Sequence, residues 1–301
     1  MEALAERVRH VRVVFPGYEG CFALLSGATG PNVKRAVIFV HGFAGSAKTT
    51  FADFLSLVDD DETADRWWES ADLYFYHYHL DSIFRKVPEN KIRLANFIDQ
   101  IYPEPPQQMF AAGAAVLRND FKYEDLVLVG HSEGGLLLRK VIVDVADSDE
   151  RIENYKFGLR FGQTAAEPEP RGLEKASMRL FAPAIGGESV TGILGLLCNL
   201  PVISLVPKLA GAKVTMNAQA TSVSVPRSAT DEYTDYLKMP CFRAHILWAD
   251  RDQIVVAEKY RRDSECRNRP LGSSHTSVCK PKRNYLLPIK FVQNGVRDGK
   301  C

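Results

Sequence analysis

The sequence carries no excess of either charge, because its 38 Lys and Arg residues nearly balance its 37 Asp and Glu residues, for a formal net charge of +1. Proteins that bind nucleic acids usually present a basic surplus to the phosphate backbone, so no nucleic-acid partner is expected. Hydrophobic residues make up 46% and charged residues 25% of the 301 residues. This is an ordinary globular composition, and we expect one domain spanning residues 1–301.

Long unbroken apolar runs are also missing. The most apolar stretch, Gly192 to Met216, is interrupted by Pro201 and Pro207, whereas a membrane-spanning helix needs about 18 or more unbroken apolar residues. We interpret the stretch as part of a cap or lid inserted over residues 184–226, with a place in the buried core as the alternative. Met1 to His10 is charged and lacks the apolar segment of a secretory signal, so a cytoplasmic protein without a transmembrane segment is expected.

The six cysteines are scattered along the chain and form no CxxC pair. A chain of this length can build its core without disulfide cross-links, so free thiols are expected. Cys266 and Cys279 both lie in the irregular segment around His275, and they would be the pair to form a disulfide if the protein were exported.

Apolar runs alternate with helical patterns through most of the sequence, which is typical of strands joined by crossover helices into a mostly parallel α/β sheet. The expected strands are Arg12 to Phe15, Cys21 to Leu25, Ala36 to Val40, Asp72 to Tyr78, Leu126 to Val129, Met178 to Ala182 and Phe242 to Trp248. The expected helices are Thr49 to Val58, Gln107 to Leu117 and Gly135 to Val145. The charged stretch from Asp147 to Lys175 is expected to be an excursion on the surface.

The sharpest motif is Gly130-His131-Ser132-Glu133-Gly134-Gly135, which matches G-x-S-x-G between an expected strand and an expected helix. The chain must turn so sharply there that a Cβ at the outer glycines would collide with neighbouring backbone. Such a turn lifts the serine hydroxyl to the top of the sheet. Ser132 is therefore predicted to be a nucleophile rather than part of a structural turn, and His131 to be a packed or hydrogen-bonded residue.

A serine hydroxyl is a weak nucleophile until a neighbouring base takes its proton. Among the seven histidines, His275 lies in a polar loop before the C-terminal helical pattern, from which a mobile base can reach the top of the sheet. The acid that orients this base should lie between Ser132 and His275 in the chain. Two carboxylates follow the last expected strand; Asp252, beyond the strand end, is preferred, and Asp250 is the alternative.

The negative charge that develops when a serine attacks a carbonyl needs two backbone N–H groups aimed at it. One is expected from Glu133, the residue after the nucleophile. The other is expected from Phe43, in a loop where Gly42 and Gly45 let the backbone approach a substrate.

Three other interpretations compete with this one. Gly42 to Thr49 reads G-x-x-x-x-A-K-T after a strand, but Ala47 stands where a phosphate-binding P-loop has a glycine. His77 and His79 would place two imidazoles on one face of a strand, as some metal sites require, yet no third ligand is evident. Neither a cofactor nor a metal is therefore expected. A binding protein that kept the fold and lost its activity is a third reading.

The combination of His41-Gly42-Phe43 with Gly130 to Gly135, Asp252 and His275 resembles the α/β-hydrolase superfamily over residues 35 to 295. The resemblance implies an α/β-hydrolase fold and a serine hydrolase that cleaves carboxylic esters through an acyl-enzyme intermediate. The stretch His275 to Pro281 before a helix is similar to a lipase-like branch that includes GPI-inositol deacylases. We expect soluble esters of short to medium acyl chains as substrates, with lipid esters, thioesters and amides as alternatives.

Overall fold

The computed structural model describes residues 10–26, 33–42, 45–51, 53–54, 70–78, 87–107, 121–163, 166–186, 227–255 and 257–301. The strands among them are β1 His10–Val14, β2 Phe22–Ser26, β3 Arg35–Val40, β4 Ala71–Tyr76, β5 Asp125–His131, β6 Ser177–Phe181, β7 His245–Leu247 and β8 Ser264–Glu265. They form one sheet in the order β1-β2-β4-β3-β5-β6-β7-β8. β1 and β2 pair antiparallel and all pairs from β4 to β8 are parallel, which confirms the expected mostly parallel α/β sheet.

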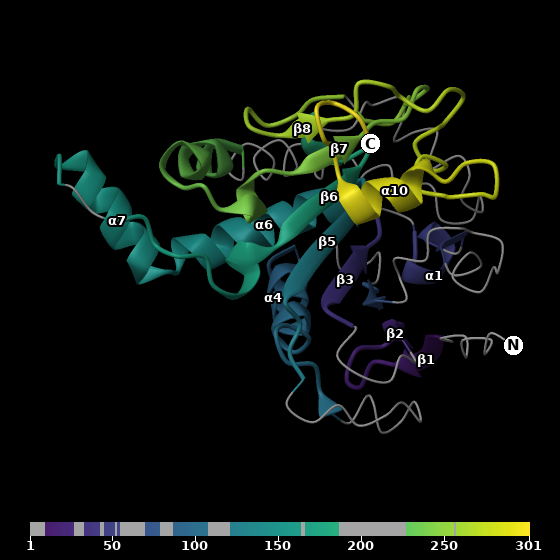
Figure 1. The fold of residues 1–301 in the computed structure, drawn as a ribbon, viewed down its shortest axis with the longest axis horizontal. Coiled ribbons are helices and arrows are strands. Elements are labelled where there is room, and N and C mark those ends of the chain that lie inside the picture. Colours follow the sequence, from purple (N-terminus) through teal and green to yellow (C-terminus); the bar gives the residue numbers. More distant parts are fainter. Residues whose placement is uncertain are drawn as a thin grey trace, which may run out of the picture.

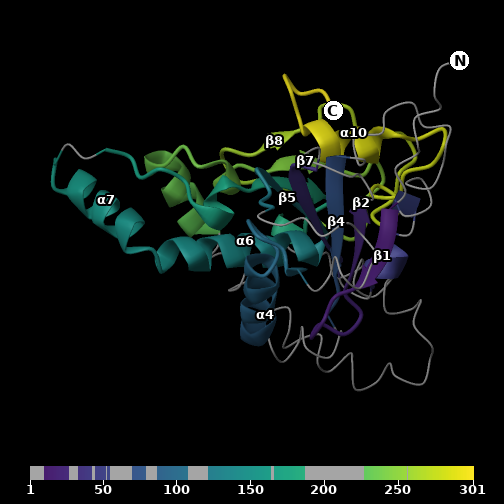
Figure 2. The same cartoon turned by 60° about the horizontal axis from the view of Figure 1, so that its bottom comes forward.

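Helices cover both faces of this sheet (Figure 1). They are α1 Ala47–Thr50, α4 Val87–Asp99, α6 Glu133–Asp147, α7 Glu150–Arg160 and α10 Leu287–Asn294, with another helix over residues 227–236 and short 3₁₀ turns η2 Gly172–Lys175, η3 Ala184–Gly186 and η5 Pro240–Phe242. Figure 2 shows α7 projecting from one end of the molecule, where the sequence predicts a surface excursion. None of the helices in the described ranges is both long and apolar enough to cross a membrane.

The two faces are filled by side chains that alternate along each strand. On one face Phe75 of β4 stacks on Phe39 of β3, with ring centroids 4.8 Å apart. On the other face Tyr76 of β4 contacts Phe97 of α4 at 5.0 Å. Continuous burial of β3, β4 and β5 explains why their sequences are apolar without a polar alternation.

All seven expected strands are present, with ends shifted by a few residues. β7 is shorter than expected because Pro240 starts the turn η5 before it. β8 was not expected, since two residues carry no periodic pattern. The cap expected over residues 184–226 lies outside the described residues except for η3, and so does most of the helix expected at Gln107 to Leu117.

A buried ion pair holds α6 to the segment before β8. The side chains of Arg139 and Asp263 are 1% and 0% exposed, and Nη2 of Arg139 lies 2.5 Å from both carboxylate oxygens. The same carboxylate accepts from the backbone N–H groups of Ala244 at 2.9 Å and Tyr260 at 3.1 Å. These bonds satisfy the buried carboxylate. Since both charges of the ion pair are buried, replacing either Arg139 or Asp263 would leave the other charge uncompensated in the core, which typically costs about 3–5 kcal/mol.

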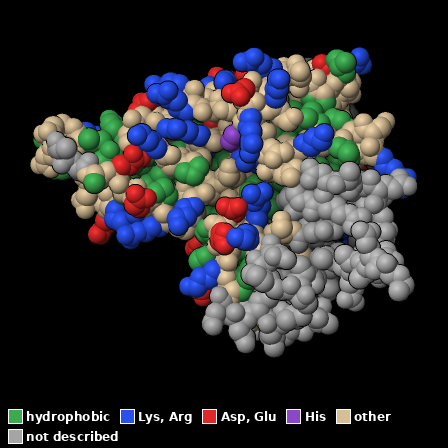
Figure 3. Space-filling view, viewed as in Figure 1, with side chains coloured by type: hydrophobic (Ala, Val, Ile, Leu, Met, Phe, Trp, Pro, Cys, Tyr) green, Lys and Arg blue, Asp and Glu red, His purple; other side chains and the backbone are tan. Residues whose placement is uncertain are grey.

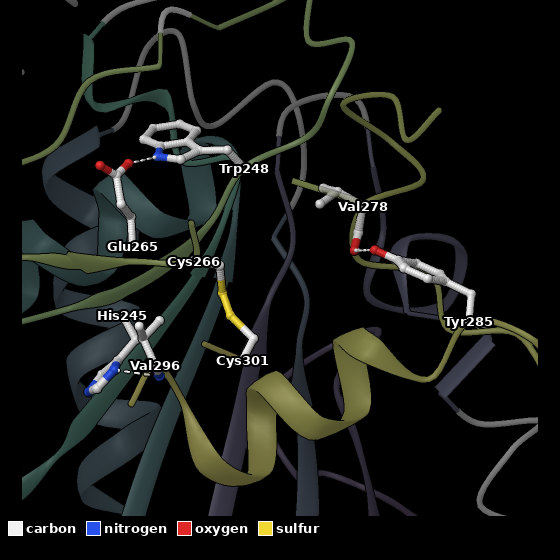
Figure 4. The surroundings of a disulfide bond; sticks show 8 residues. All are labelled: His245, Trp248, Glu265, Cys266, Val278, Tyr285, Val296 and Cys301. Carbon is white, nitrogen blue, oxygen red and sulfur yellow. Dashed lines mark hydrogen bonds between the residues drawn. A yellow bond between two sulfur atoms is a disulfide. The ribbon is translucent and has the colours of Figure 1, made fainter. Parts of the chain in front are cut away.

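The structure corrects the expectation about the cysteines. Cys266 forms a disulfide with Cys301 rather than with Cys279, and the two Cα atoms are 5.8 Å apart. Cys266 follows β8 and Cys301 follows α10, so the bond ties the chain after α10 to the edge of the sheet (Figure 4). Cys279 is buried with a free thiol, 3.8 Å from the carbonyl oxygens of Thr50 and Thr276.

Cys266 and Cys301 are 35 residues apart in the chain. The pairing depends on where α10 returns the chain, and no local pattern around the cysteines reports this. A disulfide is typical of oxidising compartments, and the cytoplasmic location stays a prediction.

We expect Cys301→Ser to lower the free energy of unfolding by about 4 kcal/mol, because a disulfide across 35 residues restricts the unfolded chain. Urea denaturation with and without dithiothreitol measures the effect. Reductant should move the wild-type midpoint to that of the variant and leave the variant unchanged. Cys279→Ala, which removes a thiol outside the bond, should still respond to reductant. A wild-type midpoint that ignores the reductant would contradict the bond.

Candidate active site

The turn between β5 and α6 holds Ser132 in a strained backbone conformation. Its φ of 53° and ψ of −123° lie where side-chain-bearing residues are rare. A Cβ on Gly130 would come within 2.6 Å of the Cα of Gly135, and one on Gly134 would press into the carbonyl oxygens of Val40 and His41. Both positions therefore require glycine, as the sequence predicts.

Hydrogen bonds from two other segments fix the backbone of Ser132. Its N–H donates to the carbonyl oxygen of Phe181 at the end of β6, at 3.0 Å. Its carbonyl oxygen accepts from the N–H groups of Gly135 at 3.1 Å and Ala184 at 3.2 Å. A strained residue of this kind costs about 1–3 kcal/mol and persists only when its surroundings enforce it, which these bonds do.

His275 and Asp252 form a buried pair on loops beyond the strands. Nδ1 of His275 lies 2.9 Å from Oδ2 of Asp252, and each side chain is 5% exposed. The second carboxylate oxygen accepts from the N–H groups of Ile254 at 3.0 Å and Val255 at 3.1 Å. A carboxylate accepts, so Nδ1 of His275 carries the proton in this contact and a neutral ring keeps Nε2 free to accept another.

Opposing effects set the charge of Asp252. Burial by itself would raise the pKa of its carboxyl group, but the hydrogen bond from His275, the charge that this ring can carry and the two backbone N–H donors outweigh burial and lower the pKa. The carboxylate is therefore ionised at neutral pH and can stabilise a positive charge on His275.

His131 connects the turn at Ser132 to the loop of His275. Nε2 of His131 lies 2.8 Å from the carbonyl oxygen of His275, and the two ring centroids are 4.9 Å apart. Because a carbonyl oxygen only accepts, Nε2 of His131 carries the proton. In the described part of the chain no hydrogen bond joins the hydroxyl of Ser132 to the ring of His275, so this contact through His131 is what brings their segments together.

Asp250, the alternative acid, has a different environment. Its Oδ2 accepts from the N–H of Gly272 at 3.0 Å, and its own N–H donates to Oγ of Ser273 at 3.0 Å. These bonds hold the start of the loop that carries His275. The geometry thus gives Asp252 the contact with the imidazole and Asp250 a contact with the loop backbone.

The loop after β3 packs directly on the turn. A Cβ on Gly42 would lie 2.7 Å from Cβ of Ser132 and 2.9 Å from the carbonyl oxygen of His131, so only glycine leaves room for this approach. The buried His41 ring stacks on Tyr78 with centroids 4.2 Å apart. Glu133 begins α6 directly after Ser132, whereas Phe43, the expected source of the second N–H donor, lies outside the described residues.

The competing motifs gain no support. The helix α1 begins within the P-loop-like segment, at Ala47, and is one turn long. Oγ1 of Thr49 accepts from the N–H of Ser46 at 3.1 Å to close a capping box. No cluster of three or more His, Cys, Asp or Glu side chains suited to a metal occurs within the described ranges. His77 is described there, and His79 lies outside them.

A mostly parallel sheet with Ser132 in a strand-turn-helix elbow is the α/β-hydrolase fold, as the sequence predicts. No family model matches the sequence, and no curated protein matches it. Several solved structures are similar to it. The lipase BlEst2 of Bacillus licheniformis is 15% identical in its propeptide form, with a TM-score of 0.49 over 95% of this chain. This chain spans 56% of the propeptide form.

The mature form of the same lipase is 16% identical, with a TM-score of 0.46 over 93% of this chain and 100% of that one. Est1E from Butyrivibrio proteoclasticus is 13% identical, with a TM-score of 0.47 over 95% of this chain and 96% of that one. The peroxisomal alpha-beta-hydrolase Lpx1 of Saccharomyces cerevisiae is 10% identical, with a TM-score of 0.47 over 98% of this chain and 91% of that one.

His131 should make stability depend on pH. Burial, followed by the neighbouring His275, lowers the pKa of His131 to about 3. In the unfolded chain His131 binds a proton near pH 6.5, whereas in the folded protein it stays neutral down to about pH 3. Acidification below about pH 6.5 therefore favours the unfolded state and lowers the free energy of unfolding. Between about pH 7.5 and about pH 5 this loss amounts to about 2 kcal/mol.

The test is His131→Gln, whose amide N–H can still donate to the carbonyl oxygen of His275. We expect its unfolding free energy, from urea denaturation at both pH values, to fall by about 2 kcal/mol less than that of the wild type. Comparing the two falls cancels any loss of packing common to both pH values. Equal falls would contradict the lowered pKa.

Proposed function

We propose that the protein is a serine hydrolase that cleaves carboxylic esters through Ser132, His275 and Asp252. The observation that carries the proposal is the pairing of a strained serine turn with a buried carboxylate that fixes the proton of His275 on Nδ1. This arrangement supplies a nucleophile, a base with a free nitrogen and an acid that stabilises the charged base.

In the proposed reaction, Nε2 of His275 accepts the hydroxyl proton of Ser132 while Oγ attacks the carbonyl carbon of the ester. The tetrahedral intermediate collapses, the alcohol leaves with the proton from His275, and the acyl group stays on Oγ. Water then attacks the acyl-enzyme as His275 takes its proton, and the carboxylic acid is released. Asp252 stays ionised throughout and stabilises the imidazolium.

The backbone supports charge development on the substrate. The N–H of Glu133 belongs to the first turn of α6, where the partial positive charge of the helix favours an anion. We assign the second donor to the N–H of Phe43, because the preceding Gly42 lies against Ser132. No cofactor or metal takes part in the proposed reaction.

The substrate proposal rests on the sequence of the insertion. Gly192 to Met216 supplies Leu, Ile and Val side chains that can line or roof an acyl pocket. We propose soluble esters of short to medium acyl chains as substrates, with lipid esters as the alternative if the segment is a lid that opens at an interface.

Ser132→Ala should abolish ester hydrolysis, with a fall in turnover on the order of a million-fold, because the nucleophile is lost. Turnover of p-nitrophenyl butyrate measures this. A fluorophosphonate probe should label the wild type and leave the variant unlabelled, and urea denaturation checks that the variant is folded. A variant that keeps a tenth of the parent turnover would rule out Ser132 as the nucleophile.

Asp252→Asn should lower turnover by about ten-thousand-fold, because the amide can no longer fix the tautomer or stabilise the charge of His275. Asp250→Asn is the matched control, since its amide oxygen can still accept from the N–H of Gly272. The turnover of this variant should fall by no more than about tenfold. Turnover of the two variants on one ester decides between the carboxylates. The reverse order would assign the acid to Asp250.

Activity on p-nitrophenyl esters should rise from acetate through the first few carbons and then fall. Burial of each methylene contributes about 0.8 kcal/mol, or about fourfold in kcat/KM, until the pocket is full. The series from acetate to palmitate, with and without dispersed lipid, measures the profile. Maximal activity on long-chain esters, with a jump in activity when the substrate exceeds its solubility, would contradict the soluble esterase and favour a lipase.

A further inference from the structure

A cleft of about 420 Å³ lies between the helix over residues 227–236, the segment before β7 and the start of β8. It is far from the proposed active site in the fold. Ser132 follows the carboxyl end of β5, whereas Ser264 in the cleft begins β8, and the strands from β5 to β8 run parallel. The cleft therefore lies at the amino ends of these parallel strands, and Ser132 lies at their carboxyl ends.

Three exposed cations line the cleft: Lys238, Arg243 and Arg262. In the described part of the chain neither the ammonium group of Lys238 nor the guanidinium group of Arg262 pairs with a carboxylate. Arg243 donates from Nη2 to the carbonyl oxygen of Leu237 at 3.4 Å, and its other N–H groups can donate to a ligand. Figure 3 shows many Lys and Arg side chains, with Asp and Glu side chains among them, on the visible surface of the described residues.

Two acidic groups lie near these cations. Asp235 also lines the cleft, but its carboxylate is paired with the guanidinium group of Arg261. Glu167 accepts from the backbone N–H of Lys238 rather than from its ammonium group. The three cations outnumber these two carboxylates, and an anion placed between the cations reduces their mutual repulsion.

We propose that this cleft binds a small molecule that carries a phosphate group. Guanidinium groups bind phosphate oxygens through pairs of parallel N–H donors, and a dianion suits three cations better than a single carboxylate does. The hydroxyl group of Ser264 is a further donor. The cleft is larger than phosphate alone and leaves room for an organic body beside Tyr236. The proposal does not rest on the proposed hydrolase activity.

Isothermal titration calorimetry on the full chain at low salt tests the proposal with phenyl phosphate, inorganic phosphate and benzoate. Phenyl phosphate should bind more tightly than inorganic phosphate, and both more tightly than benzoate. Arg262→Gln and Lys238→Gln should each weaken phenyl phosphate binding by about tenfold, because each removes one charge-assisted contact. Arg269→Gln, which removes an exposed arginine outside the cleft, should leave the affinity unchanged.

Binding should also weaken when salt is added, since the cations are exposed and screened. All three substituted side chains are exposed, so urea denaturation should give wild-type stability for each variant. Absence of phosphate binding, equal affinity in Arg262→Gln and Arg269→Gln, or benzoate binding as tight as that of phenyl phosphate would each overturn the proposal.

Discussion

The backbone of Ser132 holds its unusual conformation because three neighbouring segments press on one turn. β6 and η3 bind its backbone, and the loop after β3 fills the space beside it so closely that Gly42 has no room for a side chain. The turn is held by contacts that require β3, β5 and β6 to lie side by side. The strained residue is thus an outcome of the assembled sheet rather than of local preference.

Two buried polar links extend this constraint to parts of the chain that are distant in sequence. On one side of the turn, His131 binds the carbonyl oxygen of His275 and so places the loop that Asp252 and Asp250 also hold. On the other side, α6 carries Arg139 into its ion pair with Asp263 just before β8. Both links begin within a few residues of Ser132, so the same short segment positions the candidate nucleophile and the last third of the sheet.

The parts that the sequence predicts are those that local chemistry determines. The strands are continuous apolar runs, and the glycines around Ser132 are required by contacts within the turn itself. Asp250 and Asp252 follow the same strand two residues apart, so only the folded loop shows which of them meets His275. The partner of Cys266 was missed because it depends on the path of the chain through α10, and β8 because two residues form no pattern.

The disulfide makes a closed covalent ring of the chain from Cys266 to Cys301, and His275 and α10 both lie inside it. If α10 detaches from β6 in a local fluctuation, the disulfide keeps the chain beyond α10 next to the sheet. The contact between Phe181 and Phe291 can then re-form quickly, because the two rings stay close together. A single backbone cut within the ring would leave both pieces on one molecule. The candidate base is therefore carried on a segment that a single cut would not release from the molecule.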